Sequence, residues 1–539
     1  MQKKQTILVV ASLLVVVLSV TLAYFTAQII GKGKDVSVSS ADLKIVFTDS
    51  DGAISGSNIE PGWSDTKTFT IENKSNETYK YNIVIQDLVN TFVTEGYLQY
   101  KITSTNGGYN MTEFQDVPKS ETATDTILAY SASIDVGVTQ TYTVEFKYAN
   151  DESANQSEDM GKTLSGKLFI TEGTEQLTLL SQLLADKSTV LTRTDFSKVL
   201  TDNNTKTLYT STEDSKTVYY FAGNATDNWV KFGTFASDGP VRGYYSATIS
   251  TYKEYTTLEE CNSASSYNTN CSYPWRKGDP MYWRIIRTNS DGSVRLLYHG
   301  TSTTATDAYI GTSKFNSSRD NIAYVSYMYG SLGSIANART NQTNSSTIKT
   351  AIDNWYKDYL NTNYGKYIST TAVYCNDRST SDNTSLDNTS FGARIRLQAN
   401  KTPSYNCATI EDKFTVDKST GNGKLTYPIG LMTADEVVFA GGQWFTDAKP
   451  WYYYNSANGI STGSEYWWLL SPYRWHTSAS LAQVFHVYGS AYPGKLSYED
   501  ASDTYGVRPV LSLKSCTKYS TGNGSPETPY EIVETSSGC

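Results

Sequence analysis

The sequence predicts a mainly β protein with an α+β part, in which a β-sandwich precedes a larger mixed domain. Three observations support this prediction. Short segments in which apolar and polar residues alternate with a period of two fill residues 36–172. From about residue 216 the chain is richer in Trp, Gly and Cys, and two helix patterns stand among further strand patterns. An uncharged apolar segment precedes both parts and predicts that they are exported.

The apolar segment contains no charged residue between Lys4 and Lys32. Its most apolar part, residues 6–27, is long enough to cross a hydrocarbon core, which needs about 20 apolar residues. Basic residues precede it, as in a signal peptide. Residues 1–30 are therefore expected to form a signal or transmembrane segment, and its length favours a retained anchor. The rest of the chain would lie at the extracellular face of the cell membrane or cell surface, or be secreted if the leader is cleaved.

The strand patterns of residues 36–172 are separated by turn signals. Alternation is clearest over residues 43–47, 68–72, 79–86 and 141–148. Pro-Gly and Asn-Gly-Gly sequences stand between these segments, and both favour tight turns. Several half-buried strands joined by such turns predict a β-sandwich.

This part of the chain also resembles a known family. The motifs that carry the likeness are Leu22-Ala23-Tyr24-Phe25-Thr26, Ala41-Asp42-Leu43-Lys44-Ile45, Pro61-Gly62-Trp63-Ser64-Asp65 and Lys67-Thr68-Phe69-Thr70-Ile71-Glu72-Asn73. Over residues 15–172 they resemble the TasA/camelysin group of Gram-positive surface proteins. The resemblance implies leader cleavage near Ala27 and a jelly-roll domain able to build the fibres of a biofilm matrix. Camelysin is described as a protease, but residues 36–172 contain no His, so an HExxH site is absent.

Residues 173–215 change character and predict a helical linker. Leu177, Leu180, Leu183 and Leu184 recur at helical spacing, and a polar connector follows them.

The part of the chain from residue 216 mixes strands with helices. Asp291-Gly292 separates two apolar strand patterns, which is a strong hairpin signal. Apolar residues at helical spacing over residues 348–359 predict a helix that starts near residue 345 or 346. Thr433 and Glu436 have the spacing of a capping box and predict a second helix.

A second resemblance rests on four motifs that occur in order. They are Trp283-Arg284-Ile285, Gly430-Leu431-Met432-Thr433-Ala434-Asp435-Glu436, Tyr466-Trp467-Trp468-Leu469-Leu470-Ser471-Pro472 and Gly506-Val507-Arg508-Pro509-Val510. Over residues 216–515 they resemble a bacterial C-type-lectin-like domain of the sulfatase-modifying and variable-protein type. The resemblance implies a compact α+β domain whose loops display a variable ligand-binding face, and it does not imply an enzyme. In this fold the C-terminal stretch is the place where retroelement-driven diversity is found.

All six cysteines lie after residue 260, and an even number in an exported chain indicates disulfides. The simplest pairing joins sequence neighbours, as Cys261–Cys271, Cys375–Cys407 and Cys516–Cys539. The last pair would make residues 516–539 a disulfide-stapled C-terminal cap. With three His and no CxxC sequence, neither a metal site nor a cofactor is expected.

The ligand-binding prediction falls on residues 473–505, where aromatic, Arg and His residues stand among small ones, as is typical of binding surfaces. An alternative is that half of these aromatic residues pack the hairpin. The Trp467-Trp468 pair is predicted to lie in the core. Arg508 is expected to bind a buried carbonyl or carboxylate, with Asp435 and Glu436 as candidate partners. The residues predicted to contact a ligand are Tyr473, Arg474, Trp475, His476, His486, Tyr488, Tyr492 and Tyr498.

Composition limits the function classes. The net charge is −9 and no basic run occurs, so a nucleic-acid partner is not expected. No catalytic constellation is recognisable, so the chain is not expected to be an enzyme. The first hypothesis is a cell-surface adhesin, anchored in the membrane by its N-terminal segment, that binds an unknown glycan or protein. The alternative is a matrix or fibre subunit that self-associates through the β-sandwich.

Overall fold

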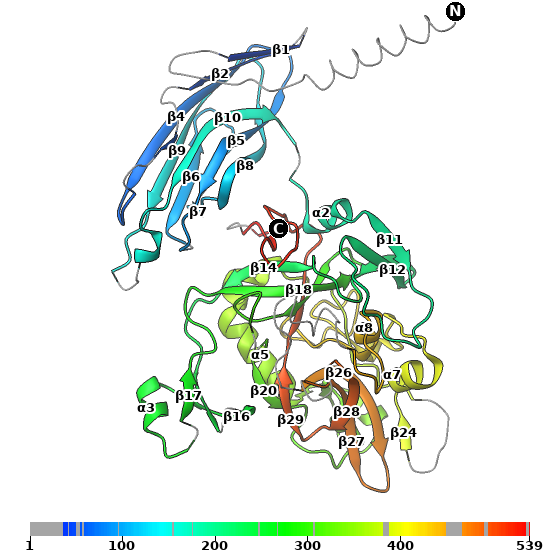
Figure 1. Ribbon diagram of the computed structural model, residues 1–539. Helices are drawn as coiled ribbons and strands as arrows, with labels where there is room; N and C mark the ends of the chain where they lie inside the picture. The colour runs from blue at the N-terminus through cyan, green and yellow to red at the C-terminus, as the bar shows by residue number, and fades with distance from the viewer. Residues whose placement is uncertain are drawn as a thin grey trace, which may run out of the picture. The chain divides into compact units, whose positions relative to one another are not determined.

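The computed structural model shows a mainly β chain with several antiparallel sheets (Figure 1). It divides after Gln176 into two compact units. Within the described residues no helix is long and apolar enough to cross a membrane. The predicted N-terminal segment 1–30 and Tyr492 lie outside the described residues. The residues described are 36–40, 43–49, 54–55, 59–94, 96–152, 156–174, 176–245, 248–266, 268–305, 308–380, 388–448, 466–489, 494–534 and 538–539.

The first unit consists of two antiparallel sheets. One has the strand order β1-β2-β4-β9-β6-β7 and the other the order β3-β10-β5-β8. The strand patterns at residues 68–72, 79–86 and 141–148 are confirmed as β4, β5 and β9. The strands are β1 (Val36–Ser40), β2 (Leu43–Asp49), β3 (Ile54–Ser55), β4 (Ser64–Asn73), β5 (Tyr79–Asn90), β6 (Leu98–Ser104), β7 (Gln115–Asp116), β8 (Ser120–Ile134), β9 (Thr139–Tyr148) and β10 (Leu164–Glu172).

Side chains from both sheets of the first unit form one hydrophobic core. Phe69 on β4 stacks on Tyr142 of β9, with ring centroids 4.9 Å apart. Ile83 and Ile85 of β5 belong to the same core from the other sheet. The alternation in the sequence arises because every second residue of a strand points to the same face, and here that face is buried.

The second unit contains more strands and all the helices of eight or more residues. Its helices are α2 (Leu179–Asp186), α3 (Leu258–Ser263), α4 (Ile335–Arg339), α5 (Thr347–Tyr359), α6 (Asn361–Tyr364), α7 (Gly392–Arg394) and α8 (Ala434–Phe439). Its strands are β11 (Thr189–Thr192), β12 (Thr207–Glu213), β13 (Lys216–Tyr220), β14 (Trp229–Thr234), β15 (Val241–Tyr245), β16 (Thr248–Tyr255), β17 (Thr269–Ser272), β18 (Pro280–Thr288), β19 (Val294–Tyr298), β20 (Gly311–Lys314), β21 (Met328–Tyr329), β22 (Asn344–Ser345), β23 (Tyr374–Cys375), β24 (Asn388–Ser390), β25 (Lys413–Phe414), β26 (Trp467–His476), β27 (Leu481–Val487), β28 (Leu496–Asp500), β29 (Thr504–Val507), β30 (Val510–Leu513) and β31 (Tyr530–Glu531). The comparison of helix lengths and both lists cover only the residues that the structure describes.

The largest sheet of the second unit corrects two predicted boundaries. It runs β11-β12-β13-β18-β14-β31, with β19 beside β18 and β30 beside β19. Residues 173–215 are therefore not a separate linker, because β11 and β12 pair within this sheet. Residues 516–539 are not a separate cap either, since β31 pairs in parallel with β14. No strand pattern marked these segments in the sequence, because β11 has only four residues, all of them exposed, and β31 has only two.

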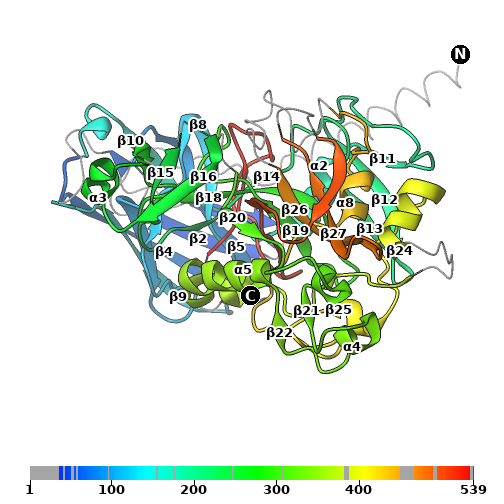
Figure 2. The ribbon, with the colours of Figure 1, turned by 90° about the horizontal axis from the view of Figure 1, so that it is seen from below.

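Another sheet runs β20-β29-β26-β27-β28 and carries the predicted ligand-binding stretch. Figure 2 shows this sheet from below, with β26 and β27 side by side and α8 nearby. Trp467 and Trp468 of β26 are fully buried, as predicted. The two predicted helices are confirmed as α5, capped by Ser346, and α8, whose N-cap Thr433 forms a capping box. The predicted hairpin at Asp291-Gly292 joins β18 to β19.

The three disulfides have the pairing that adjacency predicts: Cys261–Cys271, Cys375–Cys407 and Cys516–Cys539. Each disulfide joins cysteines that are close in the sequence. It stabilises the fold mainly because it reduces the conformational entropy of the unfolded chain.

Arg508 binds a carbonyl, one of the two kinds of partner predicted for it. Its guanidinium donates to the carbonyl oxygen of Tyr298 at 3.1 Å. The predicted carboxylate partners bind other arginines: Asp435 accepts from Arg396, and Glu436 accepts from Arg287 at 2.9 Å. The sequence could not distinguish these pairings, because each joins residues that are far apart in the chain.

Candidate functional site

Three parallel aromatic rings lie together on the sheet that contains β26. Tyr473 on β26 and Tyr498 on β28 stack with ring centroids 3.9 Å apart, and their planes are 7° apart. Trp444, which follows α8 in the sequence, lies parallel to both at centroid distances of 5.2 and 5.9 Å. We call Trp444, Tyr473 and Tyr498 the aromatic stack. Tyr473 is buried, whereas Trp444 and Tyr498 are partly exposed, so the stack reaches solvent through these two rings.

Two arginines flank the aromatic stack. The guanidinium carbon of Arg394 lies 4.7 Å from the centroid of the Tyr473 ring, and that of Arg474 lies 5.0 Å from the Tyr498 ring. Both distances lie within the range of a cation–π interaction. Burial, which outweighs the effect of the two arginines, raises the pKa of Tyr473 to about 12, so its hydroxyl is protonated at neutral pH.

The hydrogen bonds of the two arginines differ. Arg474 Nε donates to the side-chain oxygen of Gln483 at 2.5 Å, which fixes its orientation. Arg394 Nε donates to Gln398 at 3.1 Å. Arg394 Nη1 is buried and has no hydrogen-bond partner among the described residues. A buried guanidinium nitrogen without a protein partner is a group that a ligand oxygen or a water can satisfy.

An exposed phenylalanine lies next to the aromatic stack. Phe445 is 53% exposed, and its ring centroid is 5.1 Å from that of Trp444. Its φ of 53° places it in the left-handed region, where a bulky side chain costs about 1–3 kcal/mol. Lys495 Nζ lies 4.0 Å from its ring centroid. Backbone strain of this kind is concentrated at binding sites, where the surrounding fold holds it.

Of the predicted ligand contacts, Tyr473, Arg474 and Tyr498 are brought together at the aromatic stack. His486 is instead fully buried on β27, and burial lowers its pKa to about 3. It is not available to a ligand at the surface, because β27 is buried on both faces. Tyr488 is half-buried, and its ring centroid lies 4.7 Å from that of His486.

Trp475 and His476 occupy the end of the β26–β27 hairpin, where they pair with Ala482 and Leu481. Both are partly exposed. His476 Nδ1 accepts a hydrogen bond from the backbone N–H of Ala479 at 3.3 Å, so the imidazole helps to hold its own turn.

Sequence reasoning missed Trp444, Phe445 and Arg394. They lie on segments outside residues 473–505 and reach the stack only through the fold. The sequence signal for the first two was their position directly after Gly441-Gly442, because the loops that follow helices lie at the surface and often carry binding residues.

An open groove lies elsewhere on the second unit. It has a volume of about 480 Å³ and no charged lining residue. Thr347, Thr350 and Asn354 of α5 and Tyr329 of β21 lie in its lining. Its buried Asn316 donates to the Tyr324 carbonyl at 3.2 Å, so that part of the lining serves the fold.

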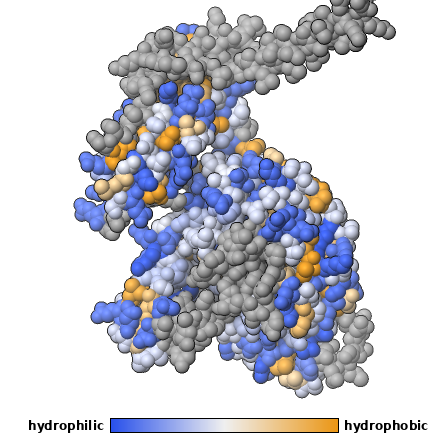
Figure 3. Space-filling model, viewed as in Figure 1, coloured by the Kyte–Doolittle hydropathy of each residue, from blue (hydrophilic) through white to orange (hydrophobic). Residues whose placement is uncertain are grey.

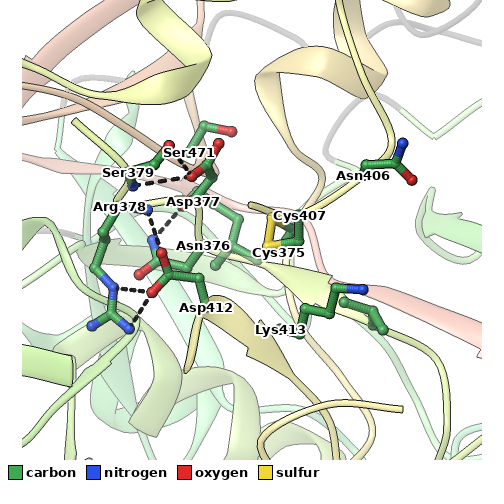
Figure 4. The surroundings of a disulfide bond; sticks show 12 residues. Cys375, Asn376, Asp377, Arg378, Ser379, Asn406, Cys407, Asp412, Lys413 and Ser471 are labelled. Carbon is green, nitrogen blue, oxygen red and sulfur yellow. Dashed lines mark hydrogen bonds and ion pairs between the residues drawn. A yellow bond between two sulfur atoms is a disulfide. The ribbon is translucent and has the colours of Figure 1, made fainter. Parts of the chain in front are cut away.

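The surroundings of the Cys375–Cys407 disulfide form a buried ionic network (Figure 4). Arg378 donates to the carboxylate of Asp412, with an Nη2–Oδ1 distance of 2.6 Å. Nearby, Glu436 Oε1 lies 2.9 Å from Arg287 Nε and 2.8 Å from Arg295 Nε. The contact with Arg295 is an ion pair and not a well-aligned hydrogen bond.

The network leaves a cavity of about 20 Å³, which has room for a single water. Its carboxylates are each paired with an arginine, for example Asp377 with Arg396 at 2.6 Å. Burial alone would raise the pKa of Glu436, but Arg295 and Arg287 lower it below its ordinary value. Because the charges are matched inside the protein, this network is a structural feature and not a ligand site.

No group of His, Cys, Asp and Glu residues suited to hold a metal ion occurs among the described residues.

Figure 3 shows hydrophobic residues in small, separate groups among hydrophilic ones on the face in view. Scattered apolar residues of this kind are normal for protein surfaces.

Comparison with known proteins identifies no family. No protein-family model matches the chain, and no curated protein matches it. One solved structure, described as "Chaperone-tip adhesin complex is vital for synergistic activation of CFA/I fimbriae biogenesis", has 12% identity and a TM-score of 0.08, covering 42% of this chain and 86% of that chain. Another, described as "Crystal Structure of Class 5 Fimbriae Chaperone CfaA", has 13% identity and a TM-score of 0.07, covering 46% and 91%. TM-scores this low carry no argument about fold or function.

Proposed function

We propose that the chain is an exported cell-surface recognition protein of the adhesin kind. Its first unit is a TasA-like jelly-roll stalk, and its second unit is a C-type-lectin-like head that binds a glycan or protein at the aromatic stack. The observation that carries the proposal is the partly exposed stack of Trp444, Tyr473 and Tyr498 with Arg394 Nη1 buried beside it without a partner among the described residues.

The chemistry of the aromatic stack suits recognition. Flat aromatic faces give a large contact area at a low cost in conformational entropy, and they pack against sugar rings or apolar side chains. Arg394 and Arg474 supply guanidinium groups, which bind carboxylates with two parallel hydrogen bonds. We therefore expect a ligand that presents a flat apolar face next to a carboxylate, such as an acidic glycan or an acidic peptide segment.

The disulfides support an extracellular location. Three of them occur in the second unit, and disulfides persist in oxidising compartments. The apolar segment of residues 1–30 would provide the route of export.

A fibre subunit is the second candidate, because β8 offers a long sheet edge. It has 15 residues and pairs only with β5 in the strand order of its sheet. An edge strand of this length presents backbone groups to another chain. Its exposed Glu121 and Asp125 oppose such pairing, since charges on edge strands prevent edge-to-edge association. Filaments in electron micrographs of the native protein, together with loss of residues 1–27 in N-terminal sequencing, would favour this candidate.

Binding assays with the full chain test the recognition function. Labelled protein is applied to arrays of glycans and of extracellular proteins, and hits are measured with Tyr498→Ala and Arg474→Ala. We expect each variant to lose at least about tenfold in affinity, because anchors of this kind contribute about 2 kcal/mol or more. Phe114→Ala is the matched control, since this aromatic ring of the first unit also lies under a cation, 3.9 Å from Lys147 Nζ.

Thermal unfolding checks that each variant remains folded. Unchanged binding by both folded variants would refute the assignment of the stack. Loss of binding in Phe114→Ala alone would place the ligand on the first unit.

A further inference from the structure

The second unit contains a buried lysine paired with a buried aspartate. The side chain of Lys187 is 1% exposed, and that of Asp227 is 8% exposed. Lys187 Nζ lies 2.7 Å from Asp227 Oδ2 and also donates to the backbone carbonyl of Asp227 at 3.1 Å. Lys187 follows α2 directly, and Asp227 stands in the loop before β14. Two segments separated by 40 residues therefore meet at one ion pair.

Aromatic rings enclose this ion pair. Lys187 Nζ lies 5.4 Å from the ring centroid of Phe221 and 5.5 Å from that of Tyr530 on β31. Water is thereby largely excluded, as the low exposure of both side chains shows. Two charges that are taken out of water cost several kcal/mol each before their attraction is counted.

The carboxylate of Asp227 is unevenly satisfied. Oδ2 accepts from Lys187 Nζ and, at 2.7 Å, from the backbone N–H of Lys206. Oδ1 is buried and has no hydrogen-bond partner in the part of the chain that the structure describes. An ionised carboxylate with one oxygen that accepts no hydrogen bond is costly in a buried place. A neutral amide oxygen in the same place costs less.

A path for protons leads away from Lys187. Nζ donates to the hydroxyl of Tyr530 at 3.1 Å, and this hydroxyl donates to Asp186 Oδ2 at 2.7 Å. Asp186 is partly exposed, so it can accept a proton and exchange it with solvent. The chain Lys187–Tyr530–Asp186 is a hydrogen-bonded path along which a proton can leave the nitrogen.

We infer that Lys187 and Asp227 join in an intramolecular amide bond, an isopeptide cross-link. One proton passes from Nζ to Oδ2, and the amine nitrogen forms a bond with Cγ of Asp227. The Cγ–Oδ2 bond breaks, and this oxygen leaves as water. A second proton leaves the nitrogen through Tyr530 to Asp186 and from there to solvent, and the departing oxygen takes up a proton from solvent in exchange and leaves as that water.

The reaction balances without another reactant. A positive and a negative group become one neutral amide and one water, and nothing is oxidised or reduced. The Lys206 N–H, which donates to Oδ2, assists the departure of that oxygen. Groups held in place react as if at effective concentrations of about 10⁵–10⁸ M, and this overcomes the unfavourable condensation of free amines with acids.

A second lysine–carboxylate pair provides an internal comparison. Lys349 Nζ contacts Asp353 one turn further along α5, and the exposed fractions of their side chains are 1% and 17%. Among the described residues this pair has neither a tyrosine bridge to a second acid nor a backbone N–H on its carboxylate. We therefore expect it to remain an ion pair.

Peptide mass mapping of the reduced, full-length protein tests the inference. We expect a branched tryptic species in which the peptides of Lys187 and Asp227 are joined, with a mass lower by one water than their sum. Trypsin should also fail to cleave after Lys187. Separate, unmodified peptides of both residues from protein that has been kept folded for days would overturn the inference, as would a cross-link found at Lys349.

Three variants sharpen the test. Lys187→Arg keeps the charge and should give no cross-link. Asp227→Asn should lose ammonia instead of water and yield the same joined species as the wild type, whereas an ordinary ion pair would leave the asparagine peptide free. Lys349→Arg is the matched control and should leave the cross-link intact. The ligand-binding proposal is independent, since it concerns other residues and a different measurement.

Discussion

His486 lies inside a ring of aromatic side chains, and its replacement by phenylalanine tests that placement. The centroids of the Tyr466, Trp468, Tyr488 and Tyr505 rings lie 5.3, 6.3, 4.7 and 5.3 Å from that of the imidazole. Neither ring nitrogen has a hydrogen-bond partner among the described residues. Burial lowers the pKa of His486 from 6.5 to about 3, so the imidazole is neutral in the folded protein at neutral pH.

This pKa sets a pH dependence of stability. Below about pH 6.5 the unfolded chain binds a proton at His486, but the folded chain does not bind it until about pH 3. The unfolded state therefore holds more protons in this window, and the free energy of unfolding falls by about 1.4 kcal/mol for each pH unit. Between pH 6.5 and 4.5 the loss from this one group is about 2.3 kcal/mol, because the unfolded imidazole is only half protonated at pH 6.5.

His486→Phe should remove this contribution and leave the rest of the pH dependence unchanged. The assay is urea unfolding at pH 4.5, 5.5 and 6.5, followed by tryptophan fluorescence, because nine of the ten Trp lie after residue 176. The stability of the variant relative to the wild type should rise steadily as the pH falls. His476→Phe, which removes a partly exposed histidine, is the control. If the free energy of unfolding of the wild type and that of His486→Phe changed with pH in the same way, the burial of His486 would be refuted.

Three further substitutions address the core of the second unit. Glu436→Gln should lower the free energy of unfolding at neutral pH by about 3–5 kcal/mol, because Arg287 and Arg295 lose a buried partner. The pKa of Glu436 is lowered in the folded protein. Its stabilising contribution is therefore present above the ordinary glutamate pKa and is lost as the pH falls through the folded pKa. Cys407→Ser should cost about 3–4 kcal/mol, because it opens a loop with a sequence separation of 32. Trp468→Ala should cost about 3–5 kcal/mol, since the ring is fully buried. Urea unfolding midpoints measure the three changes in the free energy of unfolding. A change below about 0.5 kcal/mol would contradict the burial of Glu436 or Trp468, or the disulfide of Cys407, for the variant concerned.

Local signals in the sequence predicted local structure well. The alternation on β4 and β9 predicted strands because one face of each is buried. The capping box of α8 was visible because Thr433 and Glu436 lie in one turn. The disulfides followed from adjacency, since each closes a short loop. β8 was missed because its first half is polar and exposed and gives no alternation.

Contacts between distant segments could not be predicted in the same way. Glu436 meets Arg287 across 149 residues, and no local pattern marks that pair. Trp444 joins Tyr473 and Tyr498 only because the fold brings the end of α8 against β26 and β28. His486 stood among the predicted ligand contacts, but β27 is covered on both faces, and no local pattern in the sequence shows the second cover.

Hydroxyl-radical footprinting of the full chain with a ligand identified on the arrays tests the central proposal most directly. If the second unit recognises its ligand at the aromatic stack, oxidation of Trp444, Phe445 and Tyr498 should fall when the ligand is bound. Oxidation of Tyr329 in the open groove should stay the same. Protection confined to Tyr329, or to residues of the first unit, would contradict the proposal.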